Sequence, residues 1–167
     1  MAPGNEKTAT AQGALVIERV FDAPRELVWK AWTDPEMVKR WWGPRDYTAP
    51  VAEIDFRVGG KSLNCMRSSE GQEIWSVGTY REIVPMERFV TTDSFADADG
   101  NVVPATHYGM PEDIPLEMLL TVEFEDLGDG RTKMTLRHEG LPAGEMKEGA
   151  GAGWNESFDK LAELLAG

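Results

Sequence analysis

Two stretches near the ends of the chain decide its fold: Ala23-Pro-Arg-Glu-Leu-Val-Trp-Lys-Ala-Trp-Thr-Asp-Pro-Glu-Met-Val-Lys-Arg-Trp-Trp-Gly-Pro44 and Gly151-Ala-Gly-Trp-Asn-Glu-Ser-Phe-Asp-Lys-Leu-Ala-Glu-Leu-Leu165. In the first, Val28 and Trp32 lie four residues apart on one apolar stripe, which is typical of a helix. The segment Thr33-Asp-Pro-Glu36 then restarts the chain, with either a Thr33–Glu36 capping box or a cap at Asp34. This stretch therefore predicts two consecutive helices, the second ended by the Gly-Pro pair.

The second stretch predicts one amphipathic helix near the C-terminus. Its hydrophobic residues Trp154, Phe158, Leu161 and Leu165 recur at helical spacing, and polar residues cover the other side. We expect this helix to begin near Gly153 and to span about 13 residues. Its two aromatic side chains should dock it firmly against the rest of the protein.

Between the helices the pattern alternates with a period of two, which is typical of strands. Residues 51–58 place Ala52, Ile54, Phe56 and Val58 on one face and Glu53, Asp55 and Arg57 on the other. Further strands are expected at 15–21, 61–67, 74–84, 89–95, 118–125 and 132–138, most of them joined by short turns. The predicted order is β-α-α-β6-α, an α+β fold in which a curved antiparallel sheet wraps around the long C-terminal helix.

A straight helix laid across a strongly curved sheet should leave a gap, and apolar groups would line that gap from both sides. Residues 96–115 form a long connection without periodicity, which is typical of a lid, a binding loop or a mobile segment. We expect residues 14–167 to form a single domain and Met1–Gly13 to form a disordered N-terminal tail.

The amino-acid composition excludes several classes of binding partner and indicates a cellular compartment. The net charge of −12 argues against binding to nucleic acid or to an anionic membrane surface, since both attract basic proteins. A single cysteine, Cys65, excludes an internal disulfide and suits a reducing compartment. Neither a signal peptide nor a membrane-spanning run is apparent, so we expect a cytoplasmic protein.

Seven short motifs occur in a characteristic order: Phe21-Asp-Ala-Pro-Arg-Glu-Leu-Val-Trp29, Thr33-Asp-Pro-Glu36, Trp41-Trp-Gly-Pro44, Arg57-Val-Gly-Gly60, Gly78-Thr-Tyr80, Thr132-Lys-Met-Thr-Leu136 and Gly153-Trp-Asn-Glu-Ser-Phe-Asp-Lys-Leu161. With them the chain resembles the START-like (SRPBCC, helix-grip) superfamily over residues 14–166. More closely, it is similar to the C-terminal domain of the activator of the 90-kDa heat-shock protein ATPase. The resemblance implies a hydrophobic cavity between helix and sheet. Members of the superfamily include ligand carriers, antibiotic-sequestering proteins and cyclase-like enzymes, so the fold alone does not assign a function.

The candidate pocket residues come from the inward faces of the expected strands and helices: Trp41, Tyr80, Phe95, Tyr108, Met118, Leu120, Met134, Leu136, His138, Trp154, Phe158 and Leu161. Three of them, His138, Tyr80 and Tyr108, could orient a ligand through polar contacts, and His138 is the only plausible general base. The alternative for His138 is a structural, hydrogen-bonded histidine near a strand end. The alternative for His107 and Tyr108 is a solvated loop.

Other notable residues have simpler explanations. The four tryptophans Trp29, Trp32, Trp41 and Trp42 could stack on a flat ligand, or Trp32 and Trp41 could be core residues with the other two half-exposed. Cys65 is expected to be a buried, inert thiol, and Glu53 and Asp55 to form a solvated exterior with Arg57. The spacing of His, Cys and Ser matches no metal site and no catalytic triad, so we expect no metal, no cofactor and no catalytic set.

Three functions are compatible with this pattern. The first is binding of a small hydrophobic or amphipathic molecule in the cavity, driven by burial of apolar surface. The second is an enzyme of cyclase, hydrolase or dehydratase type, which would need His138 beside a carboxylate or a tyrosine within the cavity. The third is a module that binds a chaperone or another protein, and a homodimer is also possible.

Overall fold

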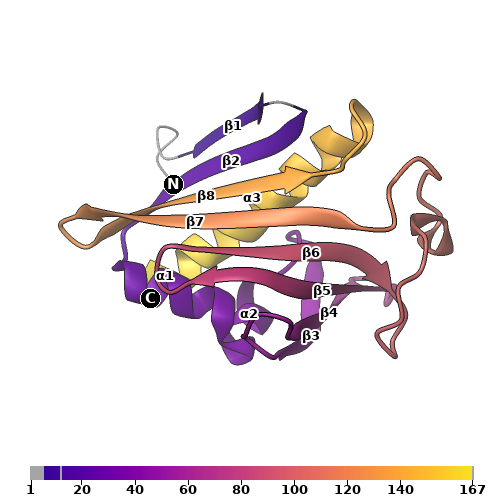
Figure 1. The fold of residues 1–167 in the computed structure, drawn as a ribbon, viewed down its shortest axis with the longest axis horizontal. Coiled ribbons are helices and arrows are strands. Elements are labelled where there is room, and N and C mark those ends of the chain that lie inside the picture. The colour runs from indigo at the N-terminus through magenta and orange to yellow at the C-terminus, as the bar shows by residue number, and fades with distance from the viewer. Residues whose placement is uncertain (1–5, 12, 167) are drawn as a thin grey trace.

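An eight-stranded antiparallel sheet forms the body of the protein in the computed structural model, which describes residues 6–11 and 13–166. The strand order is β1-β2-β8-β7-β6-β5-β4-β3, so consecutive hairpins run from β3 to β8 and β2 closes back onto β8 (Figure 1). The strands are β1 (Glu6–Ala11), β2 (Ala14–Phe21), β3 (Tyr47–Ile54), β4 (Lys61–Ser68), β5 (Glu73–Val84), β6 (Arg88–Ala96), β7 (Met118–Gly128) and β8 (Arg131–Glu139).

Three α-helices accompany the sheet within the described residues: α1 (Arg25–Thr33), α2 (Pro35–Trp41) and α3 (Glu145–Ala166). The long helix α3 lies behind the strands in Figure 1 and crosses them obliquely, while α1 and α2 lie beside its C-terminal end. A short 3-10 helix, η2 (Ala105–Tyr108), interrupts the connection between β6 and β7. This arrangement confirms the predicted helix-grip α+β fold. Among the described residues, no helix combines the length and the apolar character needed to cross a membrane.

The junction between α1 and α2 settles the question of the cap. The side chain of Asp34 accepts a hydrogen bond from the backbone N–H of Glu36 at 2.9 Å, so Asp34 is the cap of α2. Thr33 instead donates its hydroxyl to the carbonyl of Trp29 inside α1. The carbonyl of Pro24 accepts from the N–H groups of Leu27 and Val28, as expected for a helix that starts directly after it.

The N-terminal segment departs from the expected disordered tail. Glu6–Ala11 pairs with β2 as an edge strand, and the side-chain amide of Asn155 donates to the hydroxyl of Thr8 at 3.0 Å. The sequence Thr-Ala-Thr-Ala in this strand contains β-branched threonines, which favour a strand. Its low hydrophobicity is the reason that a disordered tail was predicted instead. The rest of the tail, residues 1–5 and 12, lies outside the described residues.

The strand expected at 51–58 is shifted toward the N-terminus, since β3 ends at Ile54. A tight turn follows, in which the N–H of Asp55 bonds to the carbonyl of Lys61. Gly60 is required there, because a Cβ at this position would lie 2.1 Å from the carbonyl oxygen of Asp55. Val58 consequently points outward with 60% of its surface exposed, contrary to the predicted inward face.

Helix α3 begins eight residues earlier than predicted, at Glu145 rather than Gly153, and is 22 residues long. Three glycines at 149, 151 and 153 lower the helix propensity of this first part, which explains the late predicted start. Lys160 on this helix donates to the carbonyls of Trp42, Pro44 and Tyr47, at 3.5, 3.2 and 3.2 Å. These contacts attach the segment between α2 and β3 to α3.

The core is dense beneath the C-terminal half of α3. Phe158 and Leu161 are fully buried, and an edge-to-face contact joins Trp32 and Trp41 with ring centroids 4.7 Å apart. Trp29 is also buried, at 8% exposure, against the ring of Phe124, so it is not the half-exposed residue expected. This half of the helix is packed solid against the sheet.

Candidate functional site

A cavity of about 330 Å³ lies beneath the N-terminal half of α3. Its sides come from α3 (Met146, Ala150 and Trp154), from the connection 96–115 (Met110 and Ile114) and from strands β4 to β7 (Met66, Ile74, Phe95 and Met118). Most of these side chains are apolar, and the volume falls within the range of pockets that hold small molecules. The gap expected between helix and sheet is therefore present under one half of the helix and closed under the other.

The glycines that lower the helix propensity at the start of α3 also help to explain why the cavity exists. Gly149 and Gly153 line it, and Ala150 between them has only a methyl group. A Cβ at Gly153 would already touch the ring of Pro44 at 3.5 Å, and Gly151 approaches Leu15 in the same way at 3.4 Å. Small residues thus let the helix lie close to its neighbours without filling the space below it.

His138 and Trp154 join β8 to α3 at the wall of this cavity. The indole N–H of Trp154 donates to Nδ1 of His138 at 3.2 Å. Because Nδ1 accepts this bond, the neutral imidazole has its proton on Nε2. The geometry therefore fixes both the tautomer of His138 and the orientation of its ring.

The carboxylate of Asp93 faces the other nitrogen of the same ring. Nε2 of His138 lies 3.3 Å from Oδ2 of Asp93, a close contact that is not a hydrogen bond, and Nε2 has no hydrogen-bond partner among the described residues. The side chain of His138 is 6% exposed and that of Asp93 is 23% exposed. Trp154, His138 and Asp93 thus form a polar chain along an otherwise apolar wall.

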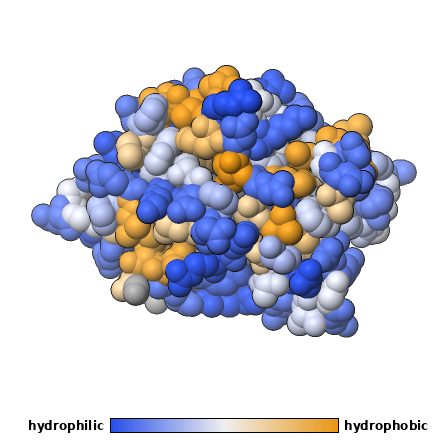
Figure 2. All heavy atoms as spheres, turned by 90° about the horizontal axis from the view of Figure 1, so that it is seen from below, coloured by the Kyte–Doolittle hydropathy of each residue, from blue (hydrophilic) through white to orange (hydrophobic). Residues whose placement is uncertain are grey.

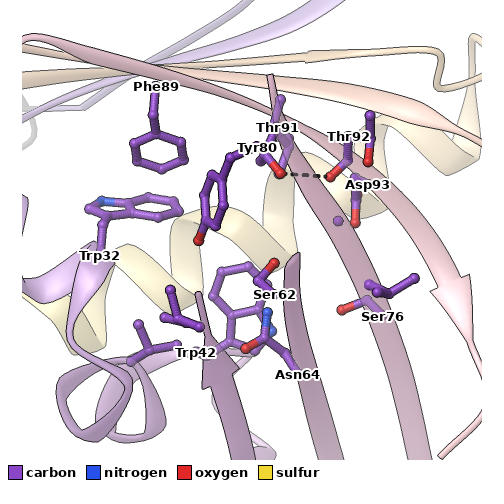
Figure 3. Close-up of a pocket in the computed structure, with 15 residues that line it drawn as sticks. Trp32, Trp42, Ser62, Asn64, Ser76, Tyr80, Phe89, Thr91, Thr92 and Asp93 are labelled. Carbon is purple, nitrogen blue, oxygen red and sulfur yellow. Dashed lines mark hydrogen bonds between the residues drawn. The ribbon is translucent and has the colours of Figure 1, made fainter. Parts of the chain in front are cut away.

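A second, smaller cavity of about 40 Å³ adjoins this polar chain (Figure 3). Trp42, Ser76 and Asp93 line both cavities, so these three residues lie between them. Polar side chains from β4, β5 and β6 surround the smaller one, as Figure 3 shows for Ser62, Asn64, Ser76, Tyr80, Thr91 and Thr92. Its size and polarity suit a few ordered water molecules or the polar end of a ligand.

Two buried groups in the smaller cavity have notable chemistry. Burial raises the pKa of Tyr80 to about 12, although a hydrogen bond with Ser62 opposes the shift. The amide oxygen of Asn64 is buried and has no hydrogen-bond partner among the described residues, while Asn64 itself is 8% exposed. A buried acceptor without a donor is costly, so this oxygen is available to a donor from a ligand or water.

The structure separates the twelve candidate pocket residues into those that line the large cavity, those that line the small one and those that line neither. Phe95, Met118, His138 and Trp154 line the large cavity, and Tyr80 and Leu120 line the small one. Trp41, Met134, Leu136, Phe158 and Leu161 lie instead in the closed core and line neither cavity. Their polar atoms are used there: the indole of Trp32 contacts the sulfur of Met134 at 3.1 Å, and the indole of Trp41 donates to the carbonyl of Ala31.

Tyr108 also lies outside the lining of both cavities. Its hydroxyl donates to the carbonyl of Ala96 and accepts from the backbone N–H of Trp75 at 3.1 Å, which secures η2 against β5 and β6. The connection 96–115 contributes to the large cavity through Met110 and Ile114, which the sequence reasoning did not identify. Asp93 was missed as well, although its place two residues before Phe95 in an alternating strand could have indicated it.

Cys65 and the pair of Asp55 and Arg57 lie as the simpler explanations predict. Cys65 is fully buried, and desolvation raises the pKa of its thiol. Arg57 and Asp55 form an exposed ion pair at 2.9 Å on the outside of the protein. No group of three His, Cys, Asp or Glu side chains is placed to hold a metal ion in residues 6–11 and 13–166.

Comparison with known proteins places this chain in a family. Residues 22–166 match the family described as activator of Hsp90 ATPase homolog 1-like protein. A solved structure from Chromobacterium violaceum is 31% identical, with a TM-score of 0.75 and coverage of 91% of this chain and 96% of that chain. Another from Arthrobacter aurescens is 26% identical, with a TM-score of 0.78 and coverage of 96% and 91%.

A third solved structure, an AHSA1 protein from Silicibacter pomeroyi, shares the fold at 24% identity with a TM-score of 0.72, covering 92% of this chain and 97% of that chain. None of the functionally curated proteins matches the chain. The family match covers most of the sequence, and the helix-grip architecture agrees with it. This chain belongs to the family of activator of Hsp90 ATPase homolog 1-like proteins, within the START-like superfamily.

Proposed function

We propose that this protein binds a small hydrophobic or amphipathic molecule in the large cavity under α3. The observation that carries the proposal is the cavity itself: about 330 Å³, walled largely by apolar side chains and built beneath a helix that contributes the small residues Gly149, Ala150 and Gly153 to its lining. A dry cavity of roughly 150 Å³ is enough to bind benzene. A cavity of twice that size suits a two-ring aromatic molecule or a short aliphatic chain.

The driving force is the burial of ligand surface. At about 25 cal/mol per Å² of apolar area, a two-ring molecule that buries roughly 200 Å² gains about 5 kcal/mol before the cost of association. A free energy of about 5 kcal/mol corresponds to a dissociation constant of roughly 0.2 mM, so tighter binding requires polar contacts as well. The polar chain of Trp154, His138 and Asp93 is placed to supply such contacts and to orient the ligand.

A thermal unfolding experiment with a set of one-ring to three-ring hydrophobic compounds tests the proposal. We expect the two-ring compounds to raise the midpoint of unfolding in a concentration-dependent way, because ligands that bind only the folded state stabilise it. Chemical-shift changes should include Met66, Met110 and Met118, whose methyl groups line the cavity. A midpoint that no compound moves, together with unchanged methionine methyl signals, would refute ligand binding here.

The contact between Asp93 and His138 favours a second candidate, an enzyme of hydrolase or cyclase type. A carboxylate beside an imidazole is the arrangement that orients a general base. The lone pair of Nδ1, however, is engaged by the indole N–H of Trp154, so His138 would act as a base only after Trp154 moved away. Hydrolysis of naphthyl esters at a rate that His138→Gln removes would support this function; equal rates in both proteins would exclude it for such esters.

A further inference from the structure

The ionisable groups that reach the large cavity are Asp93, Glu145 and His138, together with the phenol of Tyr47. No lysine or arginine lines either cavity among the described residues. His138, with Nδ1 accepting from Trp154, has its neutral tautomer fixed and does not neutralise a carboxylate in that state. The fixed charge around the ligand space is therefore negative, in a protein whose net charge is already −12.

Acceptor oxygens face the small cavity beside the hydroxyl groups of Ser62 and Ser76. Asp93 lines both cavities and has two acceptor oxygens, and Oδ1 of Asn64 is buried without a donor among the described residues. Figure 3 shows Ser62 and Asn64 on β4 and Ser76 and Asp93 on the neighbouring strands, around the same small hollow. The oxygen of Asn64 therefore favours a ligand group that donates a hydrogen bond, and Asp93 adds a negative charge nearby.

Resting on the proposed function, we propose that the ligand is an organic cation: an apolar body of about two rings that bears a protonated amine. The ammonium group lies beside the carboxylate of Asp93 at the junction of the cavities and points into the small cavity, which Asn64 lines with an acceptor oxygen. The apolar body lies beneath α3, against Trp154 and the apolar side chains of Met110 and Met118 that line the large cavity. An ammonium next to the ring of Trp42, which lines both cavities, also gains a cation–π contact.

The same features disfavour the carboxylate ligands that many hydrophobic cavities hold. A fatty acid or aromatic acid would bring a second negative charge beside Asp93 without a lysine or arginine to receive it. Burying an unpaired charge is costly, and a like charge close by adds to that cost. The cavity should therefore rank ligands of equal shape by charge, in the order cation, neutral molecule, anion.

Three probes of matched shape test this order: 1-naphthylmethylamine, 1-naphthalenemethanol and 1-naphthoate, each titrated calorimetrically into the full-length protein at pH 7 and low salt. We expect the amine to bind at least 10-fold more tightly than the alcohol, a difference of about 1.4 kcal/mol. The naphthoate should bind at least 10-fold more weakly than the alcohol. Added salt should reduce the preference for the amine, since screening weakens a charge interaction.

Asp93→Asn keeps the size of the side chain and removes its charge. We expect this variant to reduce the preference for the amine over the alcohol to less than threefold, while Glu53→Gln, a change of an exposed carboxylate on β3, should leave the 10-fold preference intact. Because the comparison among the three probes on the unaltered protein needs no variant, the test remains decisive even if Asp93→Asn folds poorly.

Each outcome has a defined meaning. Equal affinity for the amine and the alcohol, or tighter binding of the naphthoate, would overturn the cation preference and leave the proposed hydrophobic binding intact. A cation preference that Asp93→Asn does not reduce would overturn the role of Asp93. Failure of all three probes to bind would count against both the proposed function and this inference.

Discussion

The indole of Trp154 on α3 donates its N–H to Nδ1 of His138 on β8 at 3.2 Å. This bond joins the helix to the sheet at the boundary between the open cavity and the closed core. On one side of it the cavity begins, and on the other Trp154 stacks on Phe158 with ring centroids 5.6 Å apart. Trp154 thus contributes both packing and a directed polar contact, and the two contributions can be separated by substitution.

Trp154→Phe should cost about 1–2 kcal/mol of unfolding free energy, because it keeps an aromatic ring but leaves Nδ1 of His138 without its donor. Trp154→Ala should cost about 3 kcal/mol or more, since the stacked ring is lost as well. Urea unfolding curves give both values. In a double-mutant cycle with His138→Leu, the coupling should be about 1 kcal/mol. A coupling indistinguishable from zero would show that the bond contributes nothing in solution.

Lys160→Met should loosen the segment between α2 and β3. The ammonium of Lys160 donates to three backbone carbonyls of residues 42, 44 and 47, and desolvation lowers its pKa. A methionine leaves these carbonyls without their donor, at a cost of about 2 kcal/mol. Lys30→Met, on the exposed face of α1, is the matched control and should cost under about 0.5 kcal/mol. Equal losses in the two variants would contradict this role of Lys160.

Tyr80 should make stability depend on pH in alkaline solution. Burial raises its pKa to about 12 in the folded state, above the ordinary value of 10.0, so its contribution is fully present below pH 10. The contribution is then lost as the pH rises from about 10 to about 12, because the unfolded chain ionises first. The shift corresponds to roughly 2–3 kcal/mol.

Urea unfolding at several pH values between 8 and 11.5 measures this effect, with Tyr80→Phe as the comparison. The stability of the unaltered protein should fall relative to that of Tyr80→Phe across this range. Parallel curves for the two proteins would show that Tyr80 ionises as readily in the folded as in the unfolded chain.

The strands and helices could largely be predicted from the sequence, because alternation and helical spacing are local signals. The position of the cavity could not be predicted, because it depends on which aromatic residues fill the space between α3 and the sheet. Trp41 and Phe158 have the same character as Trp154, yet they pack into the core while Trp154 borders the opening. Asn64 and Asp93 come to line the same small cavity only through the register of β4, β5 and β6, which no local pattern specifies.

The surface of the protein carries no large hydrophobic patch, among the described residues, that would indicate a docking site. On the face shown in Figure 2, hydrophobic residues form separate groups between polar ones, without one continuous patch. Exposed large hydrophobic side chains among the described residues are Val58, Val102, Leu116 and Leu127, which come from four different segments. Isolated residues of this kind are normal on a folded protein and need no partner.

Filling the cavity from α3 tests the link between its volume and ligand binding. Ala150 lines the cavity and is half-buried, and leucine at this position adds three carbon atoms on a helix that tolerates it well. Because the added atoms bury apolar surface in existing space, Ala150→Leu should raise the unfolding free energy by about 1–2 kcal/mol. It should also weaken binding of a two-ring ligand at least 10-fold, since that ligand needs the same space.

Ala152→Leu is the matched control for this substitution. Ala152 is exposed on the same helix and lines neither cavity, so leucine there should change the unfolding free energy by less than about 0.5 kcal/mol and leave ligand affinity unchanged. Calorimetric titration of both variants separates the effect of a leucine on α3 from occupation of the cavity. If Ala150→Leu bound the ligand as tightly as Ala152→Leu, the ligand would have to lie outside the space beneath Ala150, and the proposal that it binds in this cavity would be wrong.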